Sequence, residues 1–191
     1  MVWIGTPRSS WSRARRGGGY GPPPLRDNTF LWGLPDLSES DAHKAHVGNV
    51  LLKFTAAVFR LCIQLRIPVV LENPLTSMLW VSPPIRHLLQ HRHVMHEYTD
   101  FCQEGCPYRK RTQLMFAFLD VRQCCRQCHS KRGACSFTGR PHEQLVGTRG
   151  GVFLTKLAEP YPPSLCKRLA SSIGFSICAT LSNSLNNLFN R

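Results

Sequence analysis

The near-continuous apolar run Ile67–Leu71 leads directly into Glu72, Asn73 and Pro74. A short apolar run of this kind is typical of a strand that is covered on both faces in an α/β protein. Polar residues at the carboxyl end of such a strand are the usual layout of an α/β active site. The alternative is that Glu72 only caps the helical segment that follows. The run therefore predicts an α/β fold, with Glu72 and Asn73 as candidate site residues.

The neighbouring segments predict the elements that pack around this strand. Apolar residues at helical spacing predict a helix of about seven turns that faces the sheet, and Ser38 with Asp41 resembles a capping box at its start. The apolar residues are Val47, Val50, Leu51, Phe54, Val58, Leu61, Cys62 and Leu65. We also expect strands at 1–4, 94–101 and 113–119, short helical pieces at 77–80 and 84–90, and a final helix at 163–173.

These elements predict one domain over residues 1–173. Within it, residues 8–35 are rich in Gly, Pro and Arg, which excludes regular structure and predicts a long mobile or ligand-covering loop. A second loop, rich in Cys and His, covers 120–150. Residues 174–191 are expected to form a poorly packed tail.

The chain is strongly basic, with 24 Lys and Arg against 11 Asp and Glu and a net charge of +13. This balance favours a polyanionic partner such as DNA, the alternative being surface charge without a dedicated partner. No apolar stretch approaches the ~20 residues that span a membrane, and the first residues do not resemble a signal peptide. We therefore expect an intracellular protein, nuclear or cytoplasmic, with no membrane partner.

Three segments resemble the DNA cytosine-5 methyltransferases, in particular the divergent methylase-like proteins of phages and mobile elements. In that family a strand ends in a Gly-x-Pro-Cys turn that carries the nucleophile, the next strand ends in Glu-Asn, and a later Gly-x-Pro turn precedes Arg-x-Arg. The matching segments here are Gly5-Thr6-Pro7-Arg8, Leu71-Glu72-Asn73-Pro74 and the stretch from Phe101 to Thr112.

The resemblance implies a role for each matching residue. Glu72 corresponds to the acid that contacts cytosine while a thiolate adds to the ring, and Asn73 helps to fix its turn. Arg109 and Arg111 correspond to arginines that contact the base or its phosphate. The base must leave the helix stack to reach such a site. Further phosphate contacts are expected from four basic residues, Arg13, Arg15, Arg16 and Lys110.

The chain also departs from the family. Arg8 stands at the position of the nucleophilic cysteine, and a guanidinium cannot add to cytosine, so covalent catalysis is expected to be lost. The strands and the glycine-rich turn that bind S-adenosylmethionine in the family would precede Met1. The resemblance thus implies a partial Rossmann-like S-adenosylmethionine-dependent methyltransferase fold that lacks its first strands. We expect such a chain to be inactive and to bind no S-adenosylmethionine by itself.

Two functions follow from these observations. The first is a truncated, catalytically impaired DNA (cytosine-5) methyltransferase-like protein, in which another polypeptide supplies the missing half unless the chain is a gene fragment. The alternative is a non-enzymatic, basic nucleic-acid-binding module that zinc stabilises.

Cysteine spacing points to a metal site. The chain has nine cysteines, and Cys125 and Cys128 have the two-residue spacing of a zinc knuckle, which Cys135 and His142 would complete. Cys102 and Cys106 are competing donors, and free thiols in a basic loop are the alternative.

Overall fold

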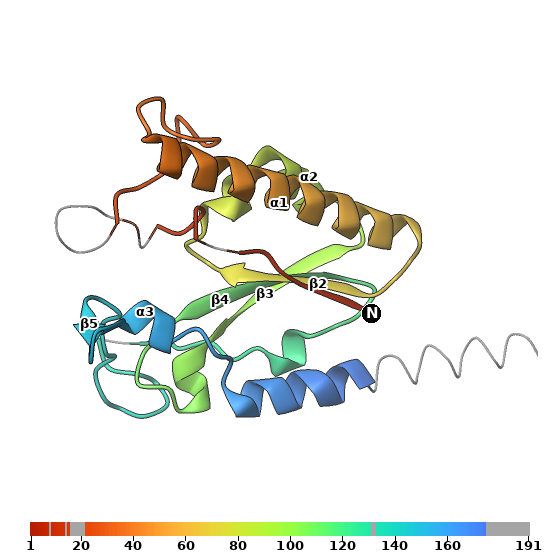
Figure 1. The fold of residues 1–191 in the computed structure, drawn as a ribbon. Helices are drawn as coiled ribbons and strands as arrows, with labels where there is room; N and C mark the ends of the chain where they lie inside the picture. The colour runs from red at the N-terminus through yellow and green to blue at the C-terminus, as the bar shows by residue number, and fades with distance from the viewer. Residues whose placement is uncertain (8, 14, 16–21, 131–132, 175–191) are drawn as a thin grey trace, which may run out of the picture.

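The structure is a computed structural model that describes residues 1–7, 9–13, 15, 22–130 and 133–174 (Figure 1). Three sequence predictions lie outside these residues. They are the nucleophile position Arg8, the phosphate contact Arg16 and the tail beyond residue 174.

A four-stranded mixed sheet forms the centre of the fold, with strand order β1-β2-β4-β3. Its strands are β1 (Val2–Gly5), β2 (Val69–Pro74), β3 (Val94–Asp100) and β4 (Arg111–Ala117). β1 is parallel to β2, whereas β4 is antiparallel to both β2 and β3. The carboxyl ends of β1, β2 and β3 and the amino end of β4 therefore lie along one edge of the sheet, which we call the carboxyl edge.

The predicted central strand is confirmed, although its boundaries shift. β2 starts at Val69 and continues through Pro74, so that Glu72 and Asn73 are strand residues, and all six except Pro74 are buried. The next helical segment, η1 (Met78–Val81), has Ser77 as its N-cap, whose hydroxyl accepts a hydrogen bond from the Leu79 amide. The alternative in which Glu72 caps this segment is therefore wrong.

Helices cover both faces of the sheet (Figure 1). α1 (Glu39–Gln64) and α2 (Pro83–Leu89) pack on one face, and a final helix over residues 163–174 packs on the other. Successive β2 side chains point to opposite faces. Val69 and Leu71 accordingly join the α1 core with Leu52, Phe59 and Met115, and Val70 joins the opposite core with Leu114, Phe116, Leu165 and Leu169.

The smaller elements lie mostly at the ends of the sheet. The strands expected at 94–101 and 113–119 are present as β3 and β4, which pair antiparallel as a hairpin with η2 (Phe101–Glu104) between them. The remaining short elements are η3 (Arg122–Cys124), β5 (Thr148–Arg149), β6 (Val152–Phe153) and α3 (Leu154–Leu157).

The long helix α1 is confirmed, but the predicted face is not. Its N-cap is Ser38, which accepts a hydrogen bond from the Asp41 amide. Most of the apolar residues expected against the sheet are exposed instead, namely Val47, Val50, Phe54, Leu61 and Leu65. The buried face carries small residues such as Ala45, Gly48 and Ala56. At Gly48 a Cβ would lie 1.9 Å from the Ser10 hydroxyl oxygen, so the glycine permits this close approach.

By length and composition alone, α1 would also be able to cross a membrane. Core helices of water-soluble proteins commonly meet the same two criteria, and seven α1 residues are buried inside the fold.

The Gly/Pro/Arg-rich loop contacts α1 in its described parts. Trp11 is fully buried and its indole N–H donates to the Gly48 carbonyl at 3.1 Å. The guanidinium of Arg26 stacks over the Trp11 ring at 3.6 Å and donates to the carbonyls of Ser10 and Ala45. These contacts fix the loop beside the turn that follows β1.

Candidate functional site

The turn after β1 and the end of β2 meet at the carboxyl edge. Gly5 pairs with Glu72 in the parallel register, and the Asn73 side-chain amide donates to the Thr6 carbonyl at 2.9 Å. The Thr6 and Thr55 hydroxyls, 2.7 Å apart, tie the same turn to α1. Sequence prediction named Glu72 and Asn73, and the structure places both, buried, beside the turn that begins at Gly5 and Thr6.

Two buried side-chain oxygens at this edge, those of Asn73 and Thr112, have no hydrogen-bond partner within the described residues. The side-chain oxygen of Asn73 accepts no hydrogen bond within the described residues, although Asn73 is only 1% exposed. Buried polar atoms are nearly always paired, so an unpaired acceptor at the end of a strand is a candidate ligand contact.

The arginine segment also reaches the carboxyl edge, because β4 is antiparallel and starts there. The Leu75 amide, just after β2, donates to the Arg111 carbonyl at 3.0 Å. The Arg111 guanidinium makes two hydrogen bonds to the buried Asp100 carboxylate, at 2.8 and 2.6 Å, and this pair raises the pKa of Arg111. Arg109 also faces Asp100, at 3.5 Å. Both predicted arginines therefore have a protein partner that sequence reasoning did not find.

The basic residues that are expected to contact phosphate also have partners inside the chain. Arg13 donates to the Asn28 side chain, and Arg15 lies 3.6 Å from the Asp41 carboxylate. Lys110 donates to the Ala158 carbonyl at 2.9 Å and lies over the Phe101 ring. Their role toward nucleic acid stays a prediction.

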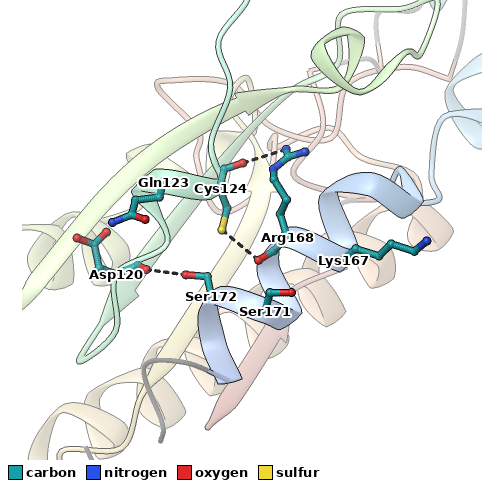
Figure 2. A pocket seen from close by; sticks show the side chains of 7 residues that line it. All are labelled: Asp120, Gln123, Cys124, Lys167, Arg168, Ser171 and Ser172. Carbon is teal, nitrogen blue, oxygen red and sulfur yellow. Dashed lines mark hydrogen bonds between the residues drawn. The ribbon is translucent and has the colours of Figure 1, made fainter. Parts of the chain in front are cut away.

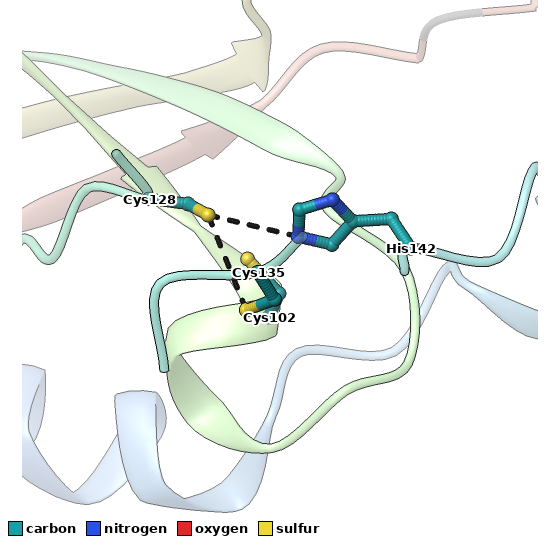
Figure 3. A group of neighbouring side chains, drawn as sticks. All are labelled: Cys102, Cys128, Cys135 and His142. Atoms are coloured by element: carbon teal, nitrogen blue, oxygen red, sulfur yellow. Dashed lines mark hydrogen bonds between the residues drawn. The ribbon is translucent and has the colours of Figure 1, made fainter. Parts of the chain in front are cut away.

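Four potential metal ligands converge beside Asp100 (Figure 3). They are Cys102 from η2, Cys128, Cys135 and His142, and their donor atoms all lie within 4.8 Å of one another. The Cys128 sulfur is 4.0 Å from that of Cys135 and 3.6 Å from Nε2 of His142. Three of the four predicted ligands are thus brought together.

Cys125 is the exception, and its place is taken by Cys102, one of the competing donors. The Cys125 sulfur faces the Val121 carbonyl at 3.5 Å, and the side chain packs against the core beneath the final helix. Burial raises the pKa of Cys125 to about 12. Cys125 itself has an extended backbone conformation, and its sulfur is not among the donor atoms that converge with that of Cys128. The two-residue spacing therefore does not form a knuckle here.

The environments of the clustered thiols differ. Burial raises the pKa of Cys102 to about 12. Burial also acts to raise the pKa of Cys135, but hydrogen bonds from the Thr138 and Phe137 amides outweigh it and lower the pKa to about 6. The site thus holds one thiol that readily ionises and one that needs a nearby cation to do so.

A separate pocket of about 540 Å³ lies between η3 and the final helix (Figure 2). The Cys124 thiol donates to the Arg168 carbonyl at 3.3 Å, and Ser172 donates to the Asp120 carbonyl at 3.2 Å. The lining residues are Asp120, Gln123, Cys124, Lys167, Arg168, Ser171 and Ser172. This set includes no predicted site residue, and sequence reasoning found no signal for it.

No protein-family model, curated protein or solved structure matches this chain. Any functional inference therefore rests on the residues and geometry of the chain itself.

Proposed function

We propose that the chain is a DNA cytosine-5 methyltransferase-like domain whose carboxyl edge binds a cytosine extruded from nucleic acid. The observation that carries this proposal is that the three segments of the resemblance, far apart in the sequence, share this edge. Asn73 is hydrogen-bonded to Thr6, and Leu75 is hydrogen-bonded to Arg111.

The topology supports the proposal at the level of fold. β1, α1 and β2 form a strand–helix–strand unit with parallel strands, and helices cover both faces of the sheet. This is the arrangement of doubly wound α/β sheets, which bind ligands beyond the carboxyl ends of their strands. A partial Rossmann-like fold is the form of this arrangement that we propose.

Glu72 is the residue to which we assign cytosine recognition. Its carboxyl group would share a proton with ring N3 and accept a hydrogen bond from the exocyclic amine, while Asn73, whose side chain points to the opposite face of β2, holds the turn at Thr6. Because Arg8 stands at the nucleophile position, the proposed role is binding of the base, without addition of a thiolate.

The described residues do not fit S-adenosylmethionine. A dinucleotide-type or nucleoside cofactor site needs a glycine-rich turn that joins a strand directly to a helix. Here β1 ends at Gly5 and the next helix starts only at Glu39. We therefore derive no methyl-transfer step, and a second polypeptide that supplies the cofactor-binding half stays a prediction.

Fluorescence anisotropy with two DNA duplexes tests the proposal. One duplex carries a single unpaired cytosine, and the other is fully paired. We expect tighter binding to the unpaired cytosine, because extruding a base from a fully paired duplex costs the free energy of unpairing and unstacking. Glu72→Ala should reduce this preference about tenfold, because it removes two hydrogen bonds to the base, each contributing about 0.5–1.5 kcal/mol, whereas glutamine would keep an equivalent donor and acceptor.

The matched control is Glu39→Ala, which removes an exposed carboxylate from the first turn of α1 and should leave the preference unchanged. Thermal unfolding by circular dichroism checks that both variants are folded. Equal affinity for the two duplexes would contradict the proposal and favour a basic module that binds nucleic acid without reading a base.

A further inference from the structure

We propose that Cys102, Cys128, Cys135 and His142 bind one Zn²⁺ ion, and that this ion fixes the arginine-bearing part of the carboxyl edge. Bond lengths of about 2.3 Å for sulfur and 2.0–2.1 Å for nitrogen, in a tetrahedron, place two sulfurs about 3.8 Å apart and a sulfur and a nitrogen about 3.6 Å apart. The structure has 4.0 Å between the sulfurs of Cys128 and Cys135 and 3.6 Å between Cys128 and His142.

The donor set selects the metal. Three thiolates and one imidazole form a soft, tetrahedral set that suits zinc and excludes magnesium or calcium, which take oxygen ligands. All three cysteines are buried and His142 is half-buried. Four protein ligands fill a tetrahedron, so the site is of the closed, structural type.

Hydrogen-bond donors surround the sulfurs as they do in metal sites. The Gln103 side-chain amide lies 3.8 Å from the sulfurs of both Cys102 and Cys135. The Ser136 amide donates to the Cys128 sulfur and the Phe137 amide to the Cys135 sulfur, each at 3.5 Å. Such donors stabilise thiolate charge and orient the ligands.

The local fold needs such a centre. Cys102, Cys128 and Cys135 form a buried cluster of their own, which contains no aliphatic or aromatic side chain. The segment that carries Cys135 and His142 is a small turn in which the Cys135 amide donates to the Arg140 carbonyl and Ala134 bridges to Pro141. Where a segment lacks an apolar core, metal binding supplies free energy of folding.

Cys128 connects the metal site to the arginines. Its amide donates to the Asp100 carboxylate at 2.7 Å, and its carbonyl accepts from Arg109 at 2.8 Å. Asp100 in turn holds Arg111. Loss of the ion would free Cys128, and with it the contacts that hold Asp100 and both arginines in place. The consequence for nucleic acid rests on the proposed function, but the ordering of this edge does not.

Metal content of the purified full chain tests the site. We expect one zinc per chain by atomic emission after dialysis, and cobalt(II) substitution should give the visible absorption of a tetrahedral thiolate site. Cys102→Ser should lower zinc affinity at least about 100-fold, because loss of an outer partner alone costs about 10–100-fold. Cys125→Ser is the matched control and should keep both the zinc and the cobalt spectrum.

Three results would overturn the site. They are the absence of bound metal in the wild-type chain, an octahedral cobalt spectrum, and loss of metal on Cys125→Ser but not on Cys102→Ser. A disulfide among the four residues, detected by mass spectrometry, would also overturn it. His142→Asn provides a second ligand variant if Cys102→Ser does not fold.

Hydrogen exchange tests the link to the arginines without nucleic acid. Chelation of the metal should speed amide exchange in residues 100–112 as well as in 126–142, while β1 and β2 keep their protection. Unchanged exchange around Arg109 and Arg111 would overturn the link. Failure of the cytosine-binding proposal would alter neither the zinc content nor this exchange pattern.

Discussion

At the scale of single residues, the buried guanidinium of Arg26 organises the segment after β1. It donates to the carbonyls of Ser10, Leu31 and Ala45 and to the side chain of Asn49. Burial lowers the pKa of Arg26 to about 10, so it stays protonated at neutral pH. A buried charge is tolerated only where its donors are paired, and these four acceptors meet that condition.

We predict that Arg26→Lys destabilises the protein by about 2–4 kcal/mol, because lysine has only three donors and leaves buried carbonyls unpaired. Urea unfolding at neutral pH measures the change. Arg60→Lys, on the exposed side of α1, is the control and should change the free energy of unfolding by less than about 0.5 kcal/mol. An equal effect of the two substitutions would show that the hydrogen bonds of Arg26 are not stabilising.

The site residues show how far single positions can be read from sequence. The position of Glu72 and Asn73 was predictable because an apolar run ends in them and a strand places its last residues at a sheet edge, whereas their role stays a prediction. Cys102 was not selected, because its convergence with Cys128 depends on the β3–β4 hairpin and on Asp100, which holds the Cys128 amide. Local spacing favoured Cys125, but that side chain packs against the core beneath the final helix, with its sulfur facing the Val121 carbonyl.

At the scale of elements, the final helix is attached through one carboxylate. Glu104, at the end of η2, accepts hydrogen bonds from the Ser164 hydroxyl and from both terminal nitrogens of Arg168, and its side chain is 1% exposed. Burial acts to raise the pKa of Glu104, but the hydrogen bonds from Arg168 and Ser164 outweigh it and lower the pKa.

This pair predicts a pH-dependent contribution to stability. Because the pKa of Glu104 is lower in the folded state than in the unfolded one, the stabilisation is present above the unfolded value and is lost as pH falls through the folded value. Glu104→Gln should cost about 2–4 kcal/mol at pH 7, where it leaves Arg168 without its charge partner. The difference between variant and wild type should shrink below about pH 4, near the ordinary pKa of glutamate.

Urea unfolding at pH 7 and at pH 3.5 measures both differences. Glu143→Gln serves as the control, because it removes an exposed carboxylate that pairs with Arg149, and exposed pairs contribute about 0–1 kcal/mol. A difference for Glu104→Gln that does not change with pH would contradict the role given to its charge.

The long helix shows what periodicity predicts at this scale and what it does not. The spacing of apolar residues predicts that α1 exists, and Ser38 marks its start. Its orientation depends on a feature that hydrophobicity does not capture: Gly48 allows the Ser10–Trp11 segment to approach the helix backbone. The face with small residues is therefore buried, and Val50 and Phe54 remain exposed.

At the scale of the whole molecule, the assembly of the carboxyl edge depends on long-range contacts. Asn73 and Arg111 belong to β2 and β4, Thr6 lies in the turn after β1, and the antiparallel insertion of β4 between β2 and β3 brings the third segment to the edge. The motifs in the sequence identified each of the three segments. The insertion of β4 and the pairing of the arginines with Asp100 were not predictable from the sequence, because both depend on how the sheet assembles.

The net charge of +13 predicts that most of the affinity for DNA is electrostatic. With about four to six phosphate contacts, affinity for a paired duplex should fall by roughly 10²–10³ between 50 and 200 mM salt. The reason is that binding releases counterions from DNA, and added salt makes this release less favourable. The ratio of affinities for an unpaired and a paired cytosine should change little with salt, since the proposed contact of Glu72 with the base releases no counterion.

Arg13→Gln and Arg15→Gln should each lower the slope of log affinity against log salt by about one. Arg60→Gln, on the outer side of α1, is the control and should leave that slope unchanged. An equal decrease for all three variants would show that the charge acts as a diffuse field and that Arg13 and Arg15 make no defined phosphate contacts.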